Sequence, residues 1–153
     1  MNTNRFQRIK GQSLFEMIVA VLIVSLVMIA LVSLSTKNLS LTAFSRNKTL
    51  ANRHSQEALE WVRGERDKGW NSFLGRSSAG GSNWCVSTLS WATSGACGSG
   101  SSIPNSTVPF LRNLTLRTSA ANTIEVTVVT SWVDGSGTHE SRASTTLTNW
   151  KKS

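Results

Sequence analysis

Residues 10–26 read KGQSLFEMIVAVLIVSL, where a basic segment meets a long apolar one. The apolar run from Met17 to Leu34 holds 18 residues, of which only two serines are polar and none is charged. A helix that spans a bilayer core of roughly 30 Å needs about 20 mainly apolar residues, and it satisfies its backbone polar groups internally. The run therefore predicts a transmembrane helix, with one carboxylate, Glu16, at its entrance.

A secretory signal peptide is a competing interpretation of the apolar run. Its hydrophobic region is about 7–15 residues long and is followed by a small-x-small cleavage site. The run here is longer, and the stretch STKNLSLTAF at residues 35–44 contains no Ala-x-Ala pattern. A plain membrane anchor is a second alternative, in which Glu16 is a chance acidic residue at the membrane interface.

The charges that flank the apolar run do not decide its orientation. Three basic residues precede the run and four lie in the twenty residues after it, so the positive-inside count is nearly tied. Cys85 and Cys97 lie twelve positions apart in a Gly/Ser-rich stretch, with no CxxC motif and both histidines remote in the sequence. This pattern favours a disulfide in an oxidising compartment over a zinc site. It places the C-terminal part of the chain outside the cytoplasm.

The helix is expected to continue beyond the membrane. From residue 35 to residue 63 the chain contains no Gly or Pro. Four residues recur at spacings of 4, 4 and 3, as on one face of an amphipathic helix: Leu50, His54, Ala58 and Trp61. Gly64 weakens this helix, and Gly69 is a better terminator. We predict one helix from about residue 12 to about residue 63.

Period-two patterns after Pro109 predict a sheet. In residues 111–118, LRNLTLRT places Leu114 and Leu116 on one face. Residues 123–150 predict a hairpin whose turn is Asp134-Gly-Ser-Gly. Its inward residues are Ile124, Val126, Val128, Trp132, Ala143 and Leu147. An antiparallel sheet of three or four strands needs a cover, and the amphipathic helix is the available one, so we predict an α+β fold.

The junction GQSLFE resembles the N-terminal signature of the type IV pilin family, which includes the pseudopilins of type II secretion. In that family a basic leader ends in Gly, and the mature chain carries Glu at its fifth position before an apolar helix. Gly11 matches the last leader residue, Gln12 the first mature residue and Glu16 the fifth. The match covers residues 5–35. The pattern V-x-V-x-x-S-W-x-D-G at residues 126–135 resembles V-type minor pilins and I-type pseudopilins.

The resemblance implies cleavage by a prepilin peptidase after Gly11, N-methylation of Gln12, and assembly with other pilin subunits into a helical filament. Glu16 would then neutralise the new amine of a neighbouring subunit. Two features depart from the family: Gln12 stands where Phe is usual, and no proline precedes Pro104, whereas many major pilins carry one in the apolar run. The missing proline favours a minor pilin or a pseudopilin.

The resemblance also implies an organisation and a location. Residues 1–11 would be a leader peptide, residues 12–36 a transmembrane and filament-core helix, and residues 37–153 an exported globular domain. Within that domain we expect an amphipathic helix at 37–63, a loop region at 64–109 and a sheet at 110–150. The chain would lie in the bacterial inner membrane with its leader in the cytoplasm, and later in a pilus or pseudopilus.

The residue types offer no catalytic constellation, and we expect neither enzyme activity nor a cofactor. A hairpin turn explains Asp134-Gly-Ser-Gly better than a calcium site does. Without the leader, 13 basic and 8 acidic residues leave a net charge of +5. The cations near the middle of the helix suit a solvated face, contact with anionic lipid, or DNA capture aided by Trp stacking. The alternative functions are a binding module at a filament tip (an adhesin or a DNA-uptake receptor, with contact loop 77–109) and an unrelated single-pass anchor.

Overall fold

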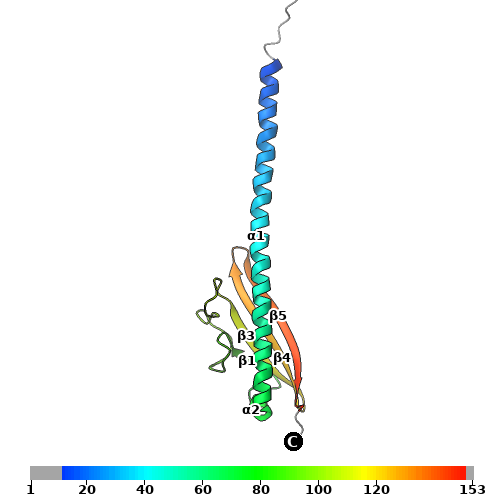
Figure 1. The fold of residues 1–153 in the computed structure, drawn as a ribbon, viewed down its shortest axis with the longest axis vertical. Helices are drawn as coiled ribbons and strands as arrows, with labels where there is room; N and C mark the ends of the chain where they lie inside the picture. Colours follow the sequence, from blue (N-terminus) through cyan, green and yellow to red (C-terminus); the bar gives the residue numbers. More distant parts are fainter. Residues whose placement is uncertain (1–11, 151–153) are drawn as a thin grey trace, which may run out of the picture. The chain divides into compact units, whose positions relative to one another are not determined.

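The chain folds into one long helix and a five-stranded antiparallel sheet (Figure 1). The computed structural model describes residues 12–150, with side chains from residue 14 onward. The helix α1 (Gln12–Lys68) is followed by the short helix α2 (Trp70–Leu74) and then by all five strands. The predicted α+β class is therefore confirmed. The expected leader, with its cleavage residue Gly11, lies outside the described residues.

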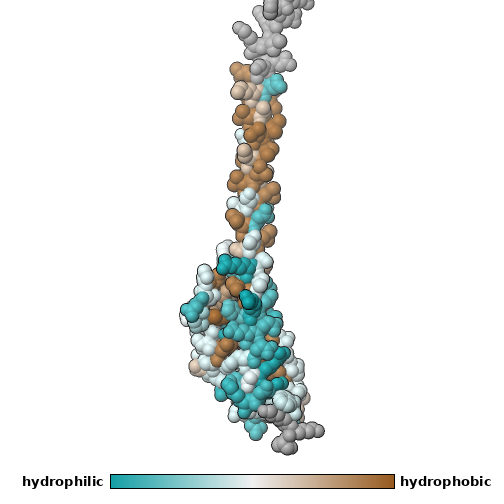
Figure 2. All heavy atoms as spheres, viewed as in Figure 1, coloured by the Kyte–Doolittle hydropathy of each residue, from teal (hydrophilic) through white to brown (hydrophobic). Residues whose placement is uncertain are grey.

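The chain divides into two compact units, one ending at Phe44 and the other beginning at Ser45. The described part of the first unit is residues 12–44 of α1. Its large apolar side chains from Leu14 to Leu34 are all between 38% and 70% exposed, and they dominate the face of this segment seen in Figure 2. By length and composition this segment makes α1 the one described helix that could cross a membrane.

Several hydroxyl groups in this part of α1 bond to its own backbone. Ser25 donates to the carbonyl of Val21 at 2.7 Å, and Ser35 donates to the carbonyl of Leu31 at 3.0 Å. Hydrogen bonds of this i to i−4 kind hide the polarity of a serine within the helix. Ser25 and Ser35 are therefore compatible with an apolar environment.

The second unit contains the sheet, whose strand order is β2-β1-β3-β4-β5. The strands are β1 (Ser82–Cys85), β2 (Thr93–Ser94), β3 (Leu111–Ala120), β4 (Thr123–Asp134) and β5 (Gly137–Thr148). The expected loop region 64–109 thus contains α2 and two short strands, and the sheet has five strands instead of three or four. Strands of four and two residues carry too little alternation to be recognised, and β1 exists because it pairs with β3.

The predicted inward faces of β3 and β4 are confirmed. Leu114 and Leu116 of β3 are completely buried, and the four inward residues of β4 are at most 1% exposed. In β5, Leu147 is buried and Ala143 packs against the same core. The hairpin between β4 and β5 closes with Asp134 opposite Gly137, which confirms the predicted turn. Gly137 has φ 129°, a backbone conformation that favours glycine.

The face of α1 that packs on the sheet differs from the predicted stripe. Its buried residues are Ala51, Ser55, Ala58, Leu59 and Val62, whereas Leu50, His54 and Trp61 are only partly buried. The contact is therefore centred about one helix position away from the predicted stripe: Ala58 is buried, while Leu50 and Trp61 are partly buried and pack against the core. Small side chains at the centre of the contact let the helix backbone approach the sheet closely. The larger apolar residues, on which the prediction relied, lie at the edges of the contact.

The predicted end of the long helix, near residue 63, was also wrong, since α1 continues to Lys68. Gly64 lies within the helix. Gly69 separates α1 from α2, in agreement with the expectation that Gly69 is the better terminator. Tertiary packing of Leu59 and Val62 on the sheet outweighs the helix penalty of one glycine, which is about 1 kcal/mol.

Replacement of Gly64 by alanine is expected to stabilise the second unit. Gly64 is exposed, and a Cβ atom there would meet no heavy atom within 4 Å. Because alanine restricts the unfolded chain and favours the helix, we expect a gain of about 0.5–1 kcal/mol in the free energy of unfolding. Denaturant unfolding followed by Trp fluorescence would measure it, and a loss of stability would contradict the described helix at residue 64.

Candidate functional site

Glu16 is the single charged residue between Gln12 and Thr36. Its side chain is exposed on α1, and within residues 14–150 no hydrogen bond or ion pair reaches it. A carboxylate placed in a membrane costs on the order of 2.5–3.5 kcal/mol on insertion scales. A cation brought to this apolar surface would offset that cost, so Glu16 is a candidate contact for a positively charged group outside the described residues.

Gln12 is the first residue of α1 and therefore lies one helical turn before Glu16. The structure thus places two of the predicted processing and assembly residues on one continuous helix, while Gly11 lies outside the described part of the chain.

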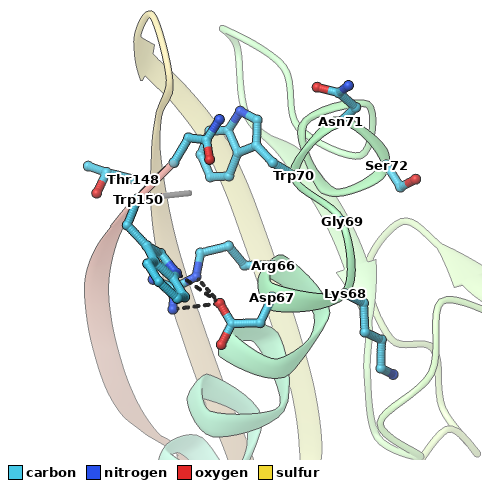
Figure 3. Close-up of a pocket in the computed structure, with 10 residues that line it drawn as sticks. Arg66, Asp67, Lys68, Gly69, Trp70, Asn71, Ser72, Thr148 and Trp150 are labelled. Atoms are coloured by element: carbon cyan, nitrogen blue, oxygen red, sulfur yellow. Dashed lines mark hydrogen bonds and ion pairs between the residues drawn. The ribbon is translucent and has the colours of Figure 1, made fainter. Parts of the chain in front are cut away.

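A pocket of about 390 Å³ lies in the second unit where the end of α1, the helix α2 and the end of β5 meet (Figure 3). Trp70 and Trp150 line it together with the ion pair Arg66–Asp67. Sequence analysis missed this pocket, because its walls come from segments about 80 positions apart along the chain.

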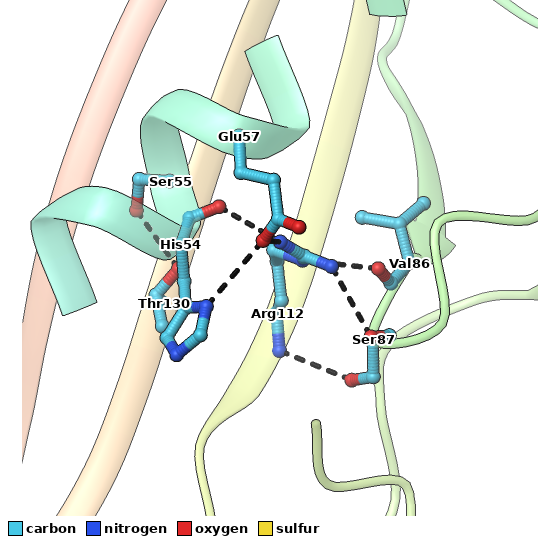
Figure 4. A network of polar contacts seen from close by, with 7 residues as sticks. All are labelled: His54, Ser55, Glu57, Val86, Ser87, Arg112 and Thr130. Carbon is cyan, nitrogen blue, oxygen red and sulfur yellow. Dashed lines mark hydrogen bonds and ion pairs between the residues drawn. The ribbon is translucent and has the colours of Figure 1, made fainter. Parts of the chain in front are cut away.

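Arg112 is the central residue of a buried polar network (Figure 4). Its side chain is 2% exposed, although it carries a charge. The guanidinium donates to the carbonyls of Val86 at 3.0 Å, Ser87 at 3.1 Å and His54 at 2.9 Å. It also donates to the carboxylate of Glu57 at 2.8 Å. Arg112 therefore joins β3 to α1 and to the segment that follows β1.

The charges in this network affect each other. Burial lowers the pKa of Arg112, and Glu57 partly opposes that change. Burial also acts to raise the pKa of Glu57, but hydrogen bonds and charge from Arg112, with a smaller contribution from His54, lower it overall. Since Glu57 is 52% exposed, water reaches the outer side of the ion pair. These contacts indicate a network that holds β3, α1 and the segment after β1 together.

The sequence contained a signal for Arg112 that was not used. Period two places residue 112 on the same face as Leu114 and Leu116, so alternation alone predicts an inward arginine. His54 was expected to be a packed, hydrogen-bonded residue. Its ring lies 5.5 Å from that of Phe110, and its Nδ1 lies 3.4 Å from a carboxylate oxygen of Glu57.

The predicted disulfide between Cys85 and Cys97 is confirmed. It attaches the Gly/Ser-rich segment to the end of β1. The backbone N–H of Cys97 also donates to the side chain of Asn113 on β3 at 2.7 Å. The disulfide and this hydrogen bond hold the segment against the sheet next to the Arg112 network.

The cations near the end of α1 are compensated by neighbouring acids. Arg63 pairs with Glu60 at 2.6 Å, Arg66 with Asp67 at 2.8 Å and Lys68 with Glu65 at 2.5 Å. Trp91 is half-buried between other rings, and it donates to Glu65 at 2.7 Å. Paired cations next to packed Trp rings favour the solvated-face interpretation of this region over nucleic-acid capture.

The turn between β4 and β5 holds a compact group of polar side chains. Asp134 Oδ1 accepts hydrogen bonds from the Ser136 hydroxyl at 2.6 Å and the Ser136 N–H at 2.8 Å, and His139 Nε2 lies 2.9 Å away. His139 was expected to be solvated, but its ring packs 5.3 Å from that of Trp132. Hydrogen bonds from Ser136 and His139 lower the pKa of Asp134 from an ordinary 3.8 to about 2.

This low pKa predicts a pH dependence of stability. Because the pKa of Asp134 is lower in the folded chain than in the unfolded chain, its contribution is fully present above about pH 4 and is lost as the pH falls through about 2. An Asp134→Asn variant should therefore lose less stability than the parent chain over that acid range. Unfolding at a series of pH values would test this, and parallel profiles for the two proteins would contradict it.

No group of three or more His, Cys, Asp or Glu residues suited to a metal ion occurs in the described part of the chain. Comparison of the chain with models of known protein families, with curated proteins and with solved structures found no match in any of the three. The functional argument therefore depends on the residues themselves.

Proposed function

We propose that the chain is a structural subunit of a type IV pilus or of a type II secretion-like filament, as a minor pilin or pseudopilin. The observation that carries the proposal is the lone Glu16 on a helix whose apolar side chains from Leu14 to Leu34 are exposed. A surface of this kind needs lipid or other helices around it, and the carboxylate needs a cation. The signature at Gly11 and Gln12 supplies that cation when cleavage creates a new N-terminal amine.

In this proposal the subunit first lies in the bacterial inner membrane, with its leader in the cytoplasm and its disulfide-containing unit outside. A prepilin peptidase cleaves after Gly11, and Gln12 becomes the methylated N-terminus. The amine of one subunit then pairs with Glu16 of the next. Contacts between different sites on identical chains are heterologous, so they build a helical filament instead of a closed dimer. The apolar parts of α1 form the core of that filament.

Intact mass and N-terminal peptide mapping of the protein from native membranes would test the proposal. We expect a chain that begins at Gln12, with a methyl group on its amine. The same measurement in cells without prepilin peptidase is the control, and it should give a chain that begins at Met1. A chain that retains its leader in cells with active peptidase would contradict the proposal and favour a plain membrane anchor.

A further inference from the structure

We propose that the pocket at the end of α1 binds a neutral oligosaccharide. The inference depends on the second unit alone and goes beyond the proposed role in a filament. The volume of the pocket, about 390 Å³, lies within the range of roughly 300–1,000 Å³ that is usual for small-ligand sites. Figure 3 shows Trp70, from the start of α2, and Trp150, from the segment after β5, among the residues that line it.

Whereas Trp132 of the same unit is 1% exposed, the Trp150 side chain is 61% exposed and presents part of its ring to solvent. Its Nε1 donates to Asp67 Oδ1 at 3.2 Å, so the ring is held by α1 and does not depend on a ligand for its orientation. The C–H groups on one face of a pyranose ring match such an aromatic surface, because the ring face carries partial negative charge.

The remaining lining residues match hydroxyl groups. Four residues with amide or hydroxyl side chains also line the pocket: Asn71, Ser72, Thr148 and Asn149. Each of these side chains both donates and accepts hydrogen bonds, as each sugar hydroxyl does.

The charges of the lining favour a neutral ligand. Arg66 is 19% exposed in its side chain and pairs with Asp67, while Lys68 pairs with Glu65 at 2.5 Å. An anion would have to compete with carboxylates that already hold these cations. A phosphate or a nucleic acid therefore gains little here, whereas a polyhydroxylated neutral ligand leaves both ion pairs intact.

The test uses the full chain, solubilised in a detergent without a sugar headgroup so that the detergent does not compete. The probes are immobilised neutral oligosaccharides of glucose, galactose and N-acetylglucosamine. We expect binding that is insensitive to salt, because screening weakens interactions between exposed charges and leaves stacking and hydrogen bonds unaffected. Trp150→Ala should weaken it about tenfold or more, and Trp150→Phe should retain part of it.

Two further variants keep the test specific. Trp70→Phe keeps an aromatic side chain but reduces the ring surface that lines the pocket, and it should weaken binding several-fold. Val133→Ala removes another exposed apolar side chain at the opposite end of β4 from Thr123, and it should bind like the parent chain. Unchanged thermal unfolding of each variant would confirm that folding is intact.

Three results would overturn the proposal. The first is that no immobilised oligosaccharide retains the chain. The second is that the parent chain and Trp150→Ala are retained equally. The third is that single-stranded DNA binds in a way that requires Trp150 and disappears at high salt. The last result would assign the pocket to nucleic acid. Because the full chain is tested before assembly, none of these results depends on cleavage after Gly11, so this proposal and the filament proposal fail independently.

Discussion

Replacement of Glu16 by alanine is expected to abolish incorporation of the subunit into filaments while leaving it in the membrane. Removal of the carboxylate makes the apolar helix easier to insert, by on the order of 2.5–3.5 kcal/mol. In the proposed filament it would also leave the amine of the neighbouring subunit without its partner in a low-dielectric setting, where the missing attraction is large. The measurement is the ratio of the variant in sheared filaments to that in the membrane fraction, and it should fall at least about tenfold.

The matched control for this prediction is Ser25→Ala, which changes a polar residue in the same apolar segment. The Ser25 hydroxyl donates only to the carbonyl of Val21 in its own helix, so this variant should assemble normally. N-terminal mapping of both variants would show whether each is still cleaved after Gly11. Normal incorporation of the Glu16 variant would reject a role of this carboxylate in assembly.

Replacement of Arg112 by methionine should cause the largest loss of folding stability in the second unit. The variant keeps a long side chain. It removes the guanidinium that donates hydrogen bonds to the carbonyls of Val86 and Ser87. Each buried acceptor that is left without its donor costs about 1–3 kcal/mol, so the total loss should be about 3–5 kcal/mol. Arg112→Lys should be intermediate, because one ammonium group cannot reach acceptors spread around a planar guanidinium. Denaturant unfolding followed by Trp fluorescence measures both losses.

Glu57→Gln is the matched control for Arg112. It removes the other member of the ion pair, but this member is 52% exposed, so the loss should stay below about 1 kcal/mol. The contrast tests whether the backbone carbonyls or the carboxylate account for the stabilisation by Arg112. Equal losses for Arg112→Met and Glu57→Gln would show that the ion pair dominates and that the carbonyl contacts contribute little.

The candidate site was predicted unevenly from the sequence. Glu16 and the pair Cys85–Cys97 were identified because each stands out against its local surroundings: one carboxylate at the entrance of an apolar run, and two cysteines in a Gly/Ser-rich stretch. The pocket between Trp70 and Trp150 was missed. Its two aromatic walls lie 80 positions apart in the chain, and no local pattern relates them.

The same distinction applies to the elements of the fold. The hairpin of β4 and β5 was predicted with its turn and its inward residues, because adjacent strands joined by two residues have only one register that buries the apolar face. The strands β1 and β2 were not predicted. Four residues, SNWC, form a strand because they pair with β3 from Ser82↔Leu116 to Cys85↔Asn113, and the disulfide holds their far end.

By itself the sequence determined that a long apolar helix carries one carboxylate near its start, that the fold is α+β, and that the two cysteines pair. These properties follow from composition and from interactions between near neighbours. Only the tertiary structure decided which face of α1 meets the sheet, where Arg112 finds its acceptors, and that Trp70 and Trp150 share a pocket. Each of these depends on close packing between segments far apart in the chain, where the size of a residue such as Ala51 or Ser55 matters more than its hydrophobicity.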